Sequence, residues 1–330
     1  MATFHQYFRK TVLFVSLVTP LSINSLLAQK IDTPTFQTEQ NADGTAKKWS
    51  GGASLGLDAA GVSLINPRVN EGEGRINIGG MFNFWANYQK KSLIWNTKGC
   101  FQLALSQDGE NFGWMKSTDA LMLNTQIGVR LRKHWYLAMM TDVQTQLLKT
   151  YDGKFLSSQS EDFNPRPLTS GFFSPATVKL APGFLWKPKP YFSLLMSAVS
   201  NKNIIVANNN LAYLVDSATN QSVFGNNGSN ISSQFGAQLR ADLNLKLAND
   251  RILLSSTLDL YSNYLKSPEN IAVEWCSQFD AILTEHLSFC LRSDMFYDHN
   301  ILVRINGNPD NLGQRVFVRN TFLLKYNRNF

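Results

Sequence analysis

Hydrophobic and polar residues alternate strictly along much of the chain. Between Gln234 and Leu247, every odd position is apolar, and every even position is polar or glycine. A period of two is the pattern of a β-strand with one apolar and one polar face. The segment after Asp250 repeats the alternation, so the two segments predict an antiparallel hairpin with a tight turn.

Segments of this kind recur from residue 51 to the end of the chain. Most exceed the about 9–11 residues that a tilted strand needs to cross a bilayer, whereas strands of soluble sheets are usually about five or six residues long. They span residues 51–64, 75–89, 93–106, 121–132, 135–148, 176–187, 191–202, 233–247, 251–265, 271–283, 287–298 and 315–330.

Two of these segments fit the pattern less well. Segment 51–64 has weak contrast between its faces, and segment 176–187 contains Pro182. Proline cannot donate to a strand ladder, so we expect a bulge there. A barrel of ten strands, with these two segments as loops, stays open beside one of twelve.

The connections between segments alternate between short and long. Short turns lie at 89–92, 133–134, 188–190, 249–250 and 284–286, and long polar loops lie at 65–74, 107–120, 149–175, 203–232, 266–270 and 299–314. Short turns on one rim and long loops on the other are typical of outer-membrane barrels. The sequence therefore predicts an all-β fold: a transmembrane antiparallel up-and-down β-barrel of about 12 strands, with short periplasmic turns, long extracellular loops and both termini periplasmic.

The N-terminus has the pattern of an export signal. Arg9 and Lys10 precede an apolar stretch at 11–27, and Ala28 supplies a small residue at a cleavage point. We expect a signal peptide at 1–28, a mobile periplasmic tail at 29–48, and the barrel at 49–330. No later stretch approaches the about 18 consecutive apolar residues of a transmembrane helix. The expected location is the cell outer membrane.

Composition agrees with a surface that alternates between lipid and water: 17% of residues are charged and 12% are aromatic. Parity places several aromatic residues on the outer face near the two rims, as expected for aromatic girdles at headgroup level. They are Tyr88, Trp95, Trp135, Trp186 and Tyr326 near the short turns, and Tyr264, Trp275 and Tyr297 near the long loops.

The chain ends on a strand with an apolar outer face. Phe322, Leu324, Tyr326 and the terminal Phe330 share this face, which resembles the signal that the outer-membrane barrel-assembly machinery recognises during insertion. Arg328 interrupts the face. The expected partners are therefore this machinery and the outer-membrane lipids.

The inner face of the predicted barrel carries charges of both signs. Charges removed from bulk water need pairing, so we expect salt bridges across the interior. Two alternatives stay open: a lumen filled by its own side chains, or a narrow polar pore. The inward charges are Arg130, Arg132, Asp142, Arg240, Asp242, Asp259, Glu274, Asp280, Arg292 and Asp294.

Charge is also uneven between the two rims. The long loops hold most of the acidic residues. The short-turn end gathers basic ones, which would meet anionic lipids or an acidic periplasmic or surface partner; they are Lys90, Lys91, Lys133, Lys187, Lys189, Lys246, Arg251 and Arg328. The net charge is +7, or +5 without Arg9 and Lys10, and does not indicate a nucleic-acid partner in an exported chain.

No catalytic, cofactor-binding or metal-binding residues are predicted. Cys100, Cys276 and Cys290 match neither a disulfide framework nor a zinc site. The turn at 284–286 sets Cys276 opposite Asp294, so we expect three unpaired cysteines in the lumen. His299 is the one histidine to weigh, as half of a lipid-facing Ser/His pair, but the neighbouring strands show no outward serine at its height.

Five stretches resemble one family. They read FWANYQKK at 84–91, LDLYSNYL at 258–265, PENIAVEW at 268–275, YDHN at 297–300, and KY at 325–326 with the terminal Phe330. They resemble the uncharacterised outer-membrane barrel family named domain of unknown function 3078 (DUF3078). The resemblance implies an outer-membrane barrel over most of 49–330 and carries no activity.

The sequence therefore favours a barrel without catalysis, acting as a structural or accessory component of an envelope assembly, secretion or surface complex. The alternatives are a narrow pore for small solutes and, more remotely, an outer-membrane lipid hydrolase.

Overall fold

A computed structural model describes residues 48–66, 75–108, 111–151, 154–155, 167–215, 222–224, 226, 228–308 and 311–329. The expected signal peptide, nearly all of the expected tail and the terminal Phe330 lie outside the described residues.

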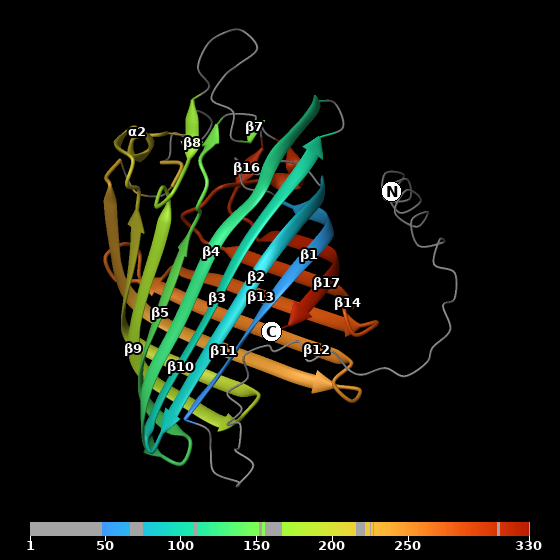
Figure 1. The fold of residues 1–330 in the computed structure, drawn as a ribbon. Coiled ribbons are helices and arrows are strands. Elements are labelled where there is room, and N and C mark those ends of the chain that lie inside the picture. The colour runs from blue at the N-terminus through green and yellow to red at the C-terminus, as the bar shows by residue number, and fades with distance from the viewer. Residues whose placement is uncertain are drawn as a thin grey trace.

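Twelve antiparallel strands close into one barrel, and each strand pairs with its neighbours in chain order (Figure 1). The predicted fold class is confirmed, and so is the count of twelve. The strands are β1 (Trp49–Ile65), β2 (Arg75–Lys90), β3 (Leu93–Asp108), β4 (Asn111–Arg132), β5 (Trp135–Thr145), β9 (Ala176–Lys189), β10 (Phe192–Ile205), β11 (Ile231–Leu247), β12 (Ile252–Asn263), β13 (Ile271–Ile282), β14 (Leu287–Tyr297) and β17 (Phe317–Asn329).

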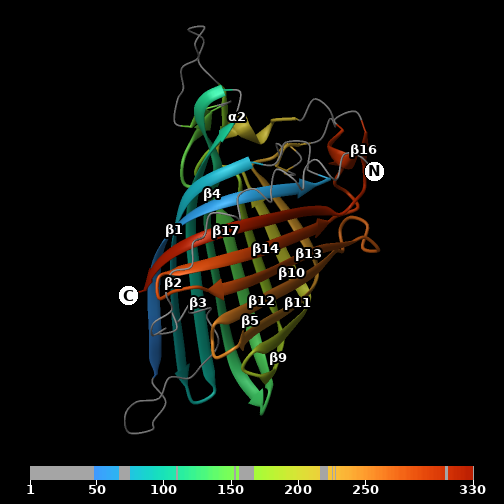
Figure 2. The same ribbon diagram turned by 90° about the vertical axis from the view of Figure 1, so that its right-hand side faces the viewer.

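The barrel closes between its first and last strands. β1 pairs with β17 from Ser54 opposite Asn329 to Ile65 opposite Val318, and Figure 2 shows the two strands side by side. Closure satisfies the backbone groups of both edge strands, which a membrane would otherwise leave without partners. At the short-turn rim, Trp49 pairs with Tyr88, so β1 begins at the rim where β17 ends. The orientation of this rim in a membrane stays a prediction.

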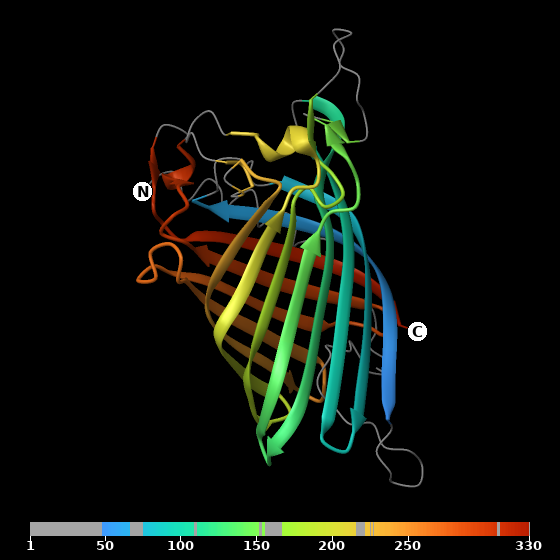
Figure 3. The ribbon, with the colours of Figure 1, turned by 90° about the vertical axis from the view of Figure 1, so that its left-hand side faces the viewer.

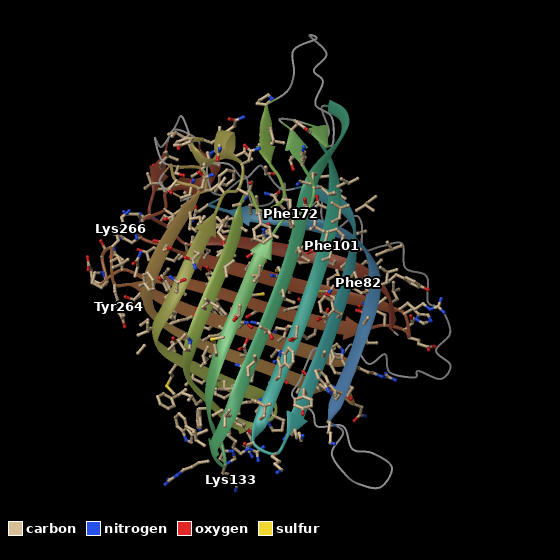
Figure 4. All side chains as sticks on the ribbon, turned by 60° about the vertical axis from the view of Figure 1, so that its left-hand side comes forward. Phe82, Phe101, Lys133, Phe172, Tyr264 and Lys266 are labelled. Carbon is tan, nitrogen blue, oxygen red and sulfur yellow. The ribbon has the colours of Figure 1, made fainter. Side chains whose placement is uncertain are left out.

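The outer face carries the apolar half of each alternating strand. On β5, Trp135, Leu137 and Met139 are exposed, while Tyr136 and Ala138 between them are buried. The same division runs around the barrel, and Figure 4 shows side chains on both faces of the wall. An apolar exterior of this kind suits a bilayer, because lipid replaces the core that a soluble sheet would need.

The predicted long loop at 107–120 is wrong. β4 begins at Asn111 and pairs with β3 up to Asp108 opposite Asn111, so this hairpin projects beyond the other strands (Figure 3). A register shift at Ala104 and Leu105 inserts one extra residue into β4. Such a bulge breaks the period of two on which the sequence prediction depended.

The expected bulge at Pro182 lies instead on the neighbouring strand. Pro182 stays in register with Met139 of β5, whereas β10 shifts register against both of its neighbours between Met196 and Asn201. The Ser197 hydroxyl donates to the Pro182 carbonyl oxygen at 2.7 Å. Next to Pro182, a Cβ on Gly183 would collide with the Met196 carbonyl oxygen, so glycine permits the close approach of the two strands.

The short turns are otherwise where the sequence placed them, within a residue or two. The third turn is shifted: β9 continues to Lys189 and β10 begins at Phe192, so the turn consists of Pro190 and Tyr191 rather than the predicted 188–190. Pro188 lies where β9 has one residue more than β10 between Trp186 and Lys189, and a bulge is one of the places in a sheet that tolerate proline.

Small elements fill the long connections and gather at one end of the barrel (Figures 1 and 3). β6 (Thr150–Tyr151), β7 (Lys154–Phe155) and β8 (Leu168–Ser170) form a three-stranded sheet, and β15 (Val303–Arg304) pairs with β16 (Leu312–Gly313). The helix α2 (Asn209–Ala212) is capped by the Asn208 side chain. An apolar cluster of Val206, Leu211 and Ala212 holds this helix in place.

No helix in the described part of the chain is long and apolar enough to span a membrane.

Candidate functional site: the barrel interior

Ion pairs cross the barrel interior at mid-height. Arg240 of β11 contacts Asp242 of its own strand at 3.2 Å and Asp142 of β5 at 3.3 Å. In the barrel, β9 and β10 separate β5 from β11, so the Arg240–Asp142 contact bridges the lumen rather than two paired strands. Asn124 also donates to Asp142, at 2.5 Å, and Thr257 donates to Asp242, at 2.8 Å. Both carboxylates are therefore fixed by more than one partner.

A second bridge lies nearer the long loops. Lys179 of β9 contacts Glu274 of β13 at 3.4 Å and Asp259 of β12 at 3.7 Å. The strands β10, β11 and β12 separate β9 from β13, so Lys179 also reaches across the interior. The Gln238 amide donates to both oxygens of Asp259, at 2.7 and 2.9 Å.

Asp294 and Asp280 hold further ion pairs: Asp294 bonds to a neighbouring strand, and Asp280 of β13 reaches over β14 to β17. Asp294 accepts from Arg292 of the same strand and from Arg319 of β17, at 2.9 and 3.2 Å. Asp280 of β13 contacts Lys325 at 2.9 Å, and its side chain is 2% exposed. A buried carboxylate of this kind requires its cation, because an unpaired charge in such a place is very costly.

Eight of the ten predicted lumen charges take part in these contacts. Arg130 instead lies over the Tyr136 ring at 5.5 Å, and Arg132 is exposed at the end of β4. Sequence reasoning missed three cations that complete the pairs, Lys179, Arg319 and Lys325. All three occupy inward positions, so parity could have found them.

Part of the interior toward the short turns is apolar, although the Asp280–Lys325 ion pair lies in the same half of the barrel. A set of inward side chains, which we call the apolar layer, is at most 8% exposed. It consists of Ile94, Tyr136, Ala138, Met140, Ala181, Leu185 and Leu195, which pack as one cluster, with Leu253 and Ile282 on β12 and β13. Most of them lie in the half of their strand next to a short turn, whereas Met140 is at the middle of β5 and Ala181 lies in the other half of β9.

Several inward charges are accessible to solvent, whereas the apolar layer is buried. The side chains of Glu274, Arg292 and Arg319 are 48%, 37% and 43% exposed, although all three sit on inward positions. Lys98, which lies within electrostatic range of Asp242 and Asp142, is exposed as well. The interior thus leaves several charges accessible to solvent and buries the side chains of the apolar layer.

Aromatic rings gather along the short-turn rim. Trp49 lies 4.7 Å from Tyr88 and 5.8 Å from Trp95, measured between ring centroids. Trp186 lies 6.1 Å from Trp135 and 6.0 Å from Phe192. We call these sets the first and second aromatic clusters. The sequence prediction omitted Trp49 and Phe192.

The remaining predicted aromatic residues also have defined partners. The Tyr326 ring lies 5.6 Å from the His286 ring, measured between centroids. Nearer the long loops, the Tyr264 hydroxyl donates to the Ala198 carbonyl oxygen at 2.9 Å, and the Trp275 indole donates to Ser256 at 2.9 Å. The polar atoms of Tyr264 and Trp275 are therefore satisfied by the protein itself, as an aromatic residue facing hydrocarbon requires.

On β17, Phe322, Leu324 and Tyr326 are exposed on the outer face, as the proposed insertion signal requires. Whether the assembly machinery reads them stays a prediction.

The cysteines are free, as predicted. Cys276 stands opposite Asp294, and Cys290 stands opposite Asp280. The His299 ring lies 3.3 Å from the Tyr297 hydroxyl. In the part of the chain that the structure describes, no three histidine, cysteine or acidic side chains gather as a metal site would require.

Comparison with known proteins confirms the family resemblance over part of the chain. The model of a family described as "Protein of unknown function (DUF3078)" matches residues 62–151. The match contains the stretch at 84–91 but not those at 258–265, 268–275, 297–300 and 325–326. No curated protein matches the chain.

Among solved structures, the chain is similar to the translocator domain of the autotransporter NalP from Neisseria meningitidis, at 9% identity over 86% of this chain and 90% of that one, with a TM-score of 0.39. It is similar to an outer-membrane channel from Pseudomonas putida F1, at 11% identity over 83% and 96%, with a TM-score of 0.37. It is also similar to the CymD monoaromatic hydrocarbon channel, at 10% identity over 85% of this chain and 88% of that one, with a TM-score of 0.35. Scores this low carry no argument about function.

Proposed function

We propose that this protein is an integral outer-membrane β-barrel with a closed interior, serving as a structural or accessory component of an envelope assembly, secretion or surface complex. The observation that carries the proposal is the apolar layer, whose inward side chains are at most 8% exposed. A barrel that conducts solutes needs a continuous hydrated path, and these side chains oppose one.

The ion pairs support the same interpretation. The bridges from Arg240 and Lys179 join strands that do not pair with each other, so they brace the wall from inside. A barrel of about this size can be filled by its own side chains. In this proposal the function belongs to the outer surface and the long loops, which would hold a partner in the envelope.

The test uses the native membrane. A photo-cross-linking amino acid replaces Lys266, which is exposed in the loop between β12 and β13. The proposal predicts one discrete cross-linked envelope protein and, after mild detergent extraction, a particle larger than the barrel alone. A barrel that is extracted as a single chain, forms no cross-link and passes ions steadily would overturn the proposal.

The second candidate is a narrow pore. It is favoured by the exposure of Glu274, Arg292 and Arg319 inside the barrel, because hydrated charges of both signs could tune the passage of small solutes. This candidate predicts steady conductance whose ion selectivity shifts in an Arg240→Gln variant. Silence of the folded protein would count against it.

Lipid hydrolysis through His299 is the weakest candidate. The His299 ring contacts the Tyr297 hydroxyl, whereas hydrolysis would need an activated serine beside the imidazole. A His299→Ala variant should leave any lipid-hydrolysing activity of the preparation unchanged, and loss of such activity would revive this candidate.

A further inference from the structure

Positive charge is concentrated on one arc of the short-turn rim. The turns that join β2 to β3, β4 to β5 and β9 to β10 follow one another around the barrel. We call their exposed cations the basic arc: Lys90, Lys91, Arg132, Lys133 and Lys189. No acidic residue lies in or beside these three turns, at 88–95, 130–136 and 186–192.

The other two short turns differ. The turn between β11 and β12 contains Asp250, which lies 3.9 Å from Lys246, and the turn between β13 and β14 contains the exposed Glu285. The rim is therefore not uniformly basic. Cations without acidic neighbours occupy one side, and balanced turns occupy the other. General solubility would not require this division.

Both aromatic clusters lie along the same arc. The first cluster, Trp49, Tyr88 and Trp95, adjoins the turn with Lys90 and Lys91. The second cluster adjoins the turns with Lys133 and Lys189, and its Trp135 pairs directly with Trp186 across β5 and β9. Exposed Trp and Tyr rings on the outer face of a barrel lie at the level of lipid headgroups.

Cations one to three residues beyond such rings lie at the level of lipid phosphates. Lys90 occupies an outward position two residues after Tyr88, and Lys133 precedes Trp135 by two. Figure 4 shows Lys133 at the lower end of the barrel and Lys266 far above it. A phosphate that approaches the arc would meet several cations, and these three turns contribute no carboxylate.

We propose that the basic arc and its two aromatic clusters bind the headgroups of anionic phospholipids, such as phosphatidylglycerol, in preference to zwitterionic ones. The aromatic rings hold the glycerol and acyl region beside the wall, and the lysines pair with the phosphate. Charge complementarity and the shared height of rings and cations favour a lipid over an acidic protein, which would not need the rings.

The test measures quenching of tryptophan fluorescence by brominated lipids. The mature protein is reconstituted in phosphatidylcholine vesicles that contain a fixed fraction of either dibrominated phosphatidylglycerol or dibrominated phosphatidylcholine. Because Trp49, Trp95 and Trp135 are exposed on the arc, lipids bound there quench them. We expect about a three- to ten-fold preference for phosphatidylglycerol at low salt, weakening as salt rises.

Two variants with equal loss of charge make the test specific. The arc variant carries Lys90→Gln, Lys91→Gln, Lys133→Gln and Lys189→Gln, and should lose the preference. The control variant carries Lys246→Gln, Arg251→Gln, Lys266→Gln and Arg315→Gln, all outside the arc, and should keep it. Heat modifiability on gels shows that each variant is folded.

Each other outcome contradicts the proposal. Equal quenching of the parent protein by both lipids overturns it and leaves the arc to an acidic protein partner. Equal loss in both variants also overturns it, because the preference would then follow net charge alone. Loss of the preference when free glycerol phosphate is added would assign the arc to a soluble phosphate rather than a lipid.

Discussion

The Arg240–Asp142 bridge offers a direct test of whether the interior braces the barrel. The Arg240 Nη1 and Asp142 Oδ2 atoms lie 3.3 Å apart, and the side chains of Arg240 and Asp142 are 13% and 25% exposed. At an effective dielectric constant of about 20, two unit charges at this distance attract by about 5 kcal/mol. Desolvation of both groups and the competing contact of Arg240 with Asp242 offset much of this attraction.

We therefore expect a coupling energy of about 1–2 kcal/mol between the two positions in a double-mutant cycle. The variants are Arg240→Met, which keeps most of the side-chain volume, Asp142→Asn, which keeps a partner for Asn124, and the double variant. Arg240→Met alone should destabilise the barrel by about 1–3 kcal/mol, because it leaves two carboxylates without their cation.

Urea unfolding of the barrel in lipid vesicles, followed by tryptophan fluorescence, measures the four stabilities. The matched control is the Lys246–Asp250 pair at the rim, 3.9 Å apart with the Asp250 side chain 57% exposed, for which coupling should stay below about 0.5 kcal/mol. Coupling for Arg240 and Asp142 no larger than that of the control would refute the idea that the bridge braces the wall.

Three other perturbations bear on the interior. Leu195→Ala removes a side chain that is 1% exposed and should cost about 2–4 kcal/mol in urea unfolding; a loss under about 1 kcal/mol would mean that the apolar layer is loosely packed. Lys325→Met leaves Asp280 buried and unpaired and should cost about 3–5 kcal/mol, whereas unchanged stability would show that water reaches Asp280. A small water-soluble maleimide should modify Cys276, which is partly exposed, far faster than Cys290, which is fully buried; equal rates, measured by mass spectrometry, would contradict a dry interior around Cys290.

The strands could be predicted from the sequence because lipid and water impose opposite demands on alternate positions. The limits of β4 could not be predicted from the sequence. The extra residue at Ser117 shifts the faces of the strand, so 111–116 no longer continues the pattern of the residues from 118 onward. The position of the bulge in β10 could not be predicted either. Proline indicates a disturbed strand ladder, but the extra residue lies on the partner strand β10, where the Ser197 hydroxyl donates to the Pro182 carbonyl oxygen.

Parity also identified most of the inward charges, but not which of them meet. Arg240 and Asp142 are far apart in sequence and are not on paired strands. Their contact depends on the tilt and curvature of the closed wall, which periodicity does not encode. The same holds for Lys179 and Glu274.

The sequence contains a signal for the apolar layer, but the search for alternating residues did not use it. Near the short turns, apolar residues run consecutively, at 93–95, 135–140, 184–186, 194–196, 252–254 and 281–283. A strand that is apolar on both faces is buried on both faces. In a membrane barrel one of those faces meets lipid, so the other must meet a filled interior.

Single-channel recording in a planar bilayer tests the closed interior most directly. The mature barrel is purified, shown to be folded by heat modifiability, and inserted at low density over a wide range of voltage. With the apolar layer intact, we predict no steady open steps from the parent protein. Long-lived, voltage-independent steps from the folded parent protein would contradict a closed lumen.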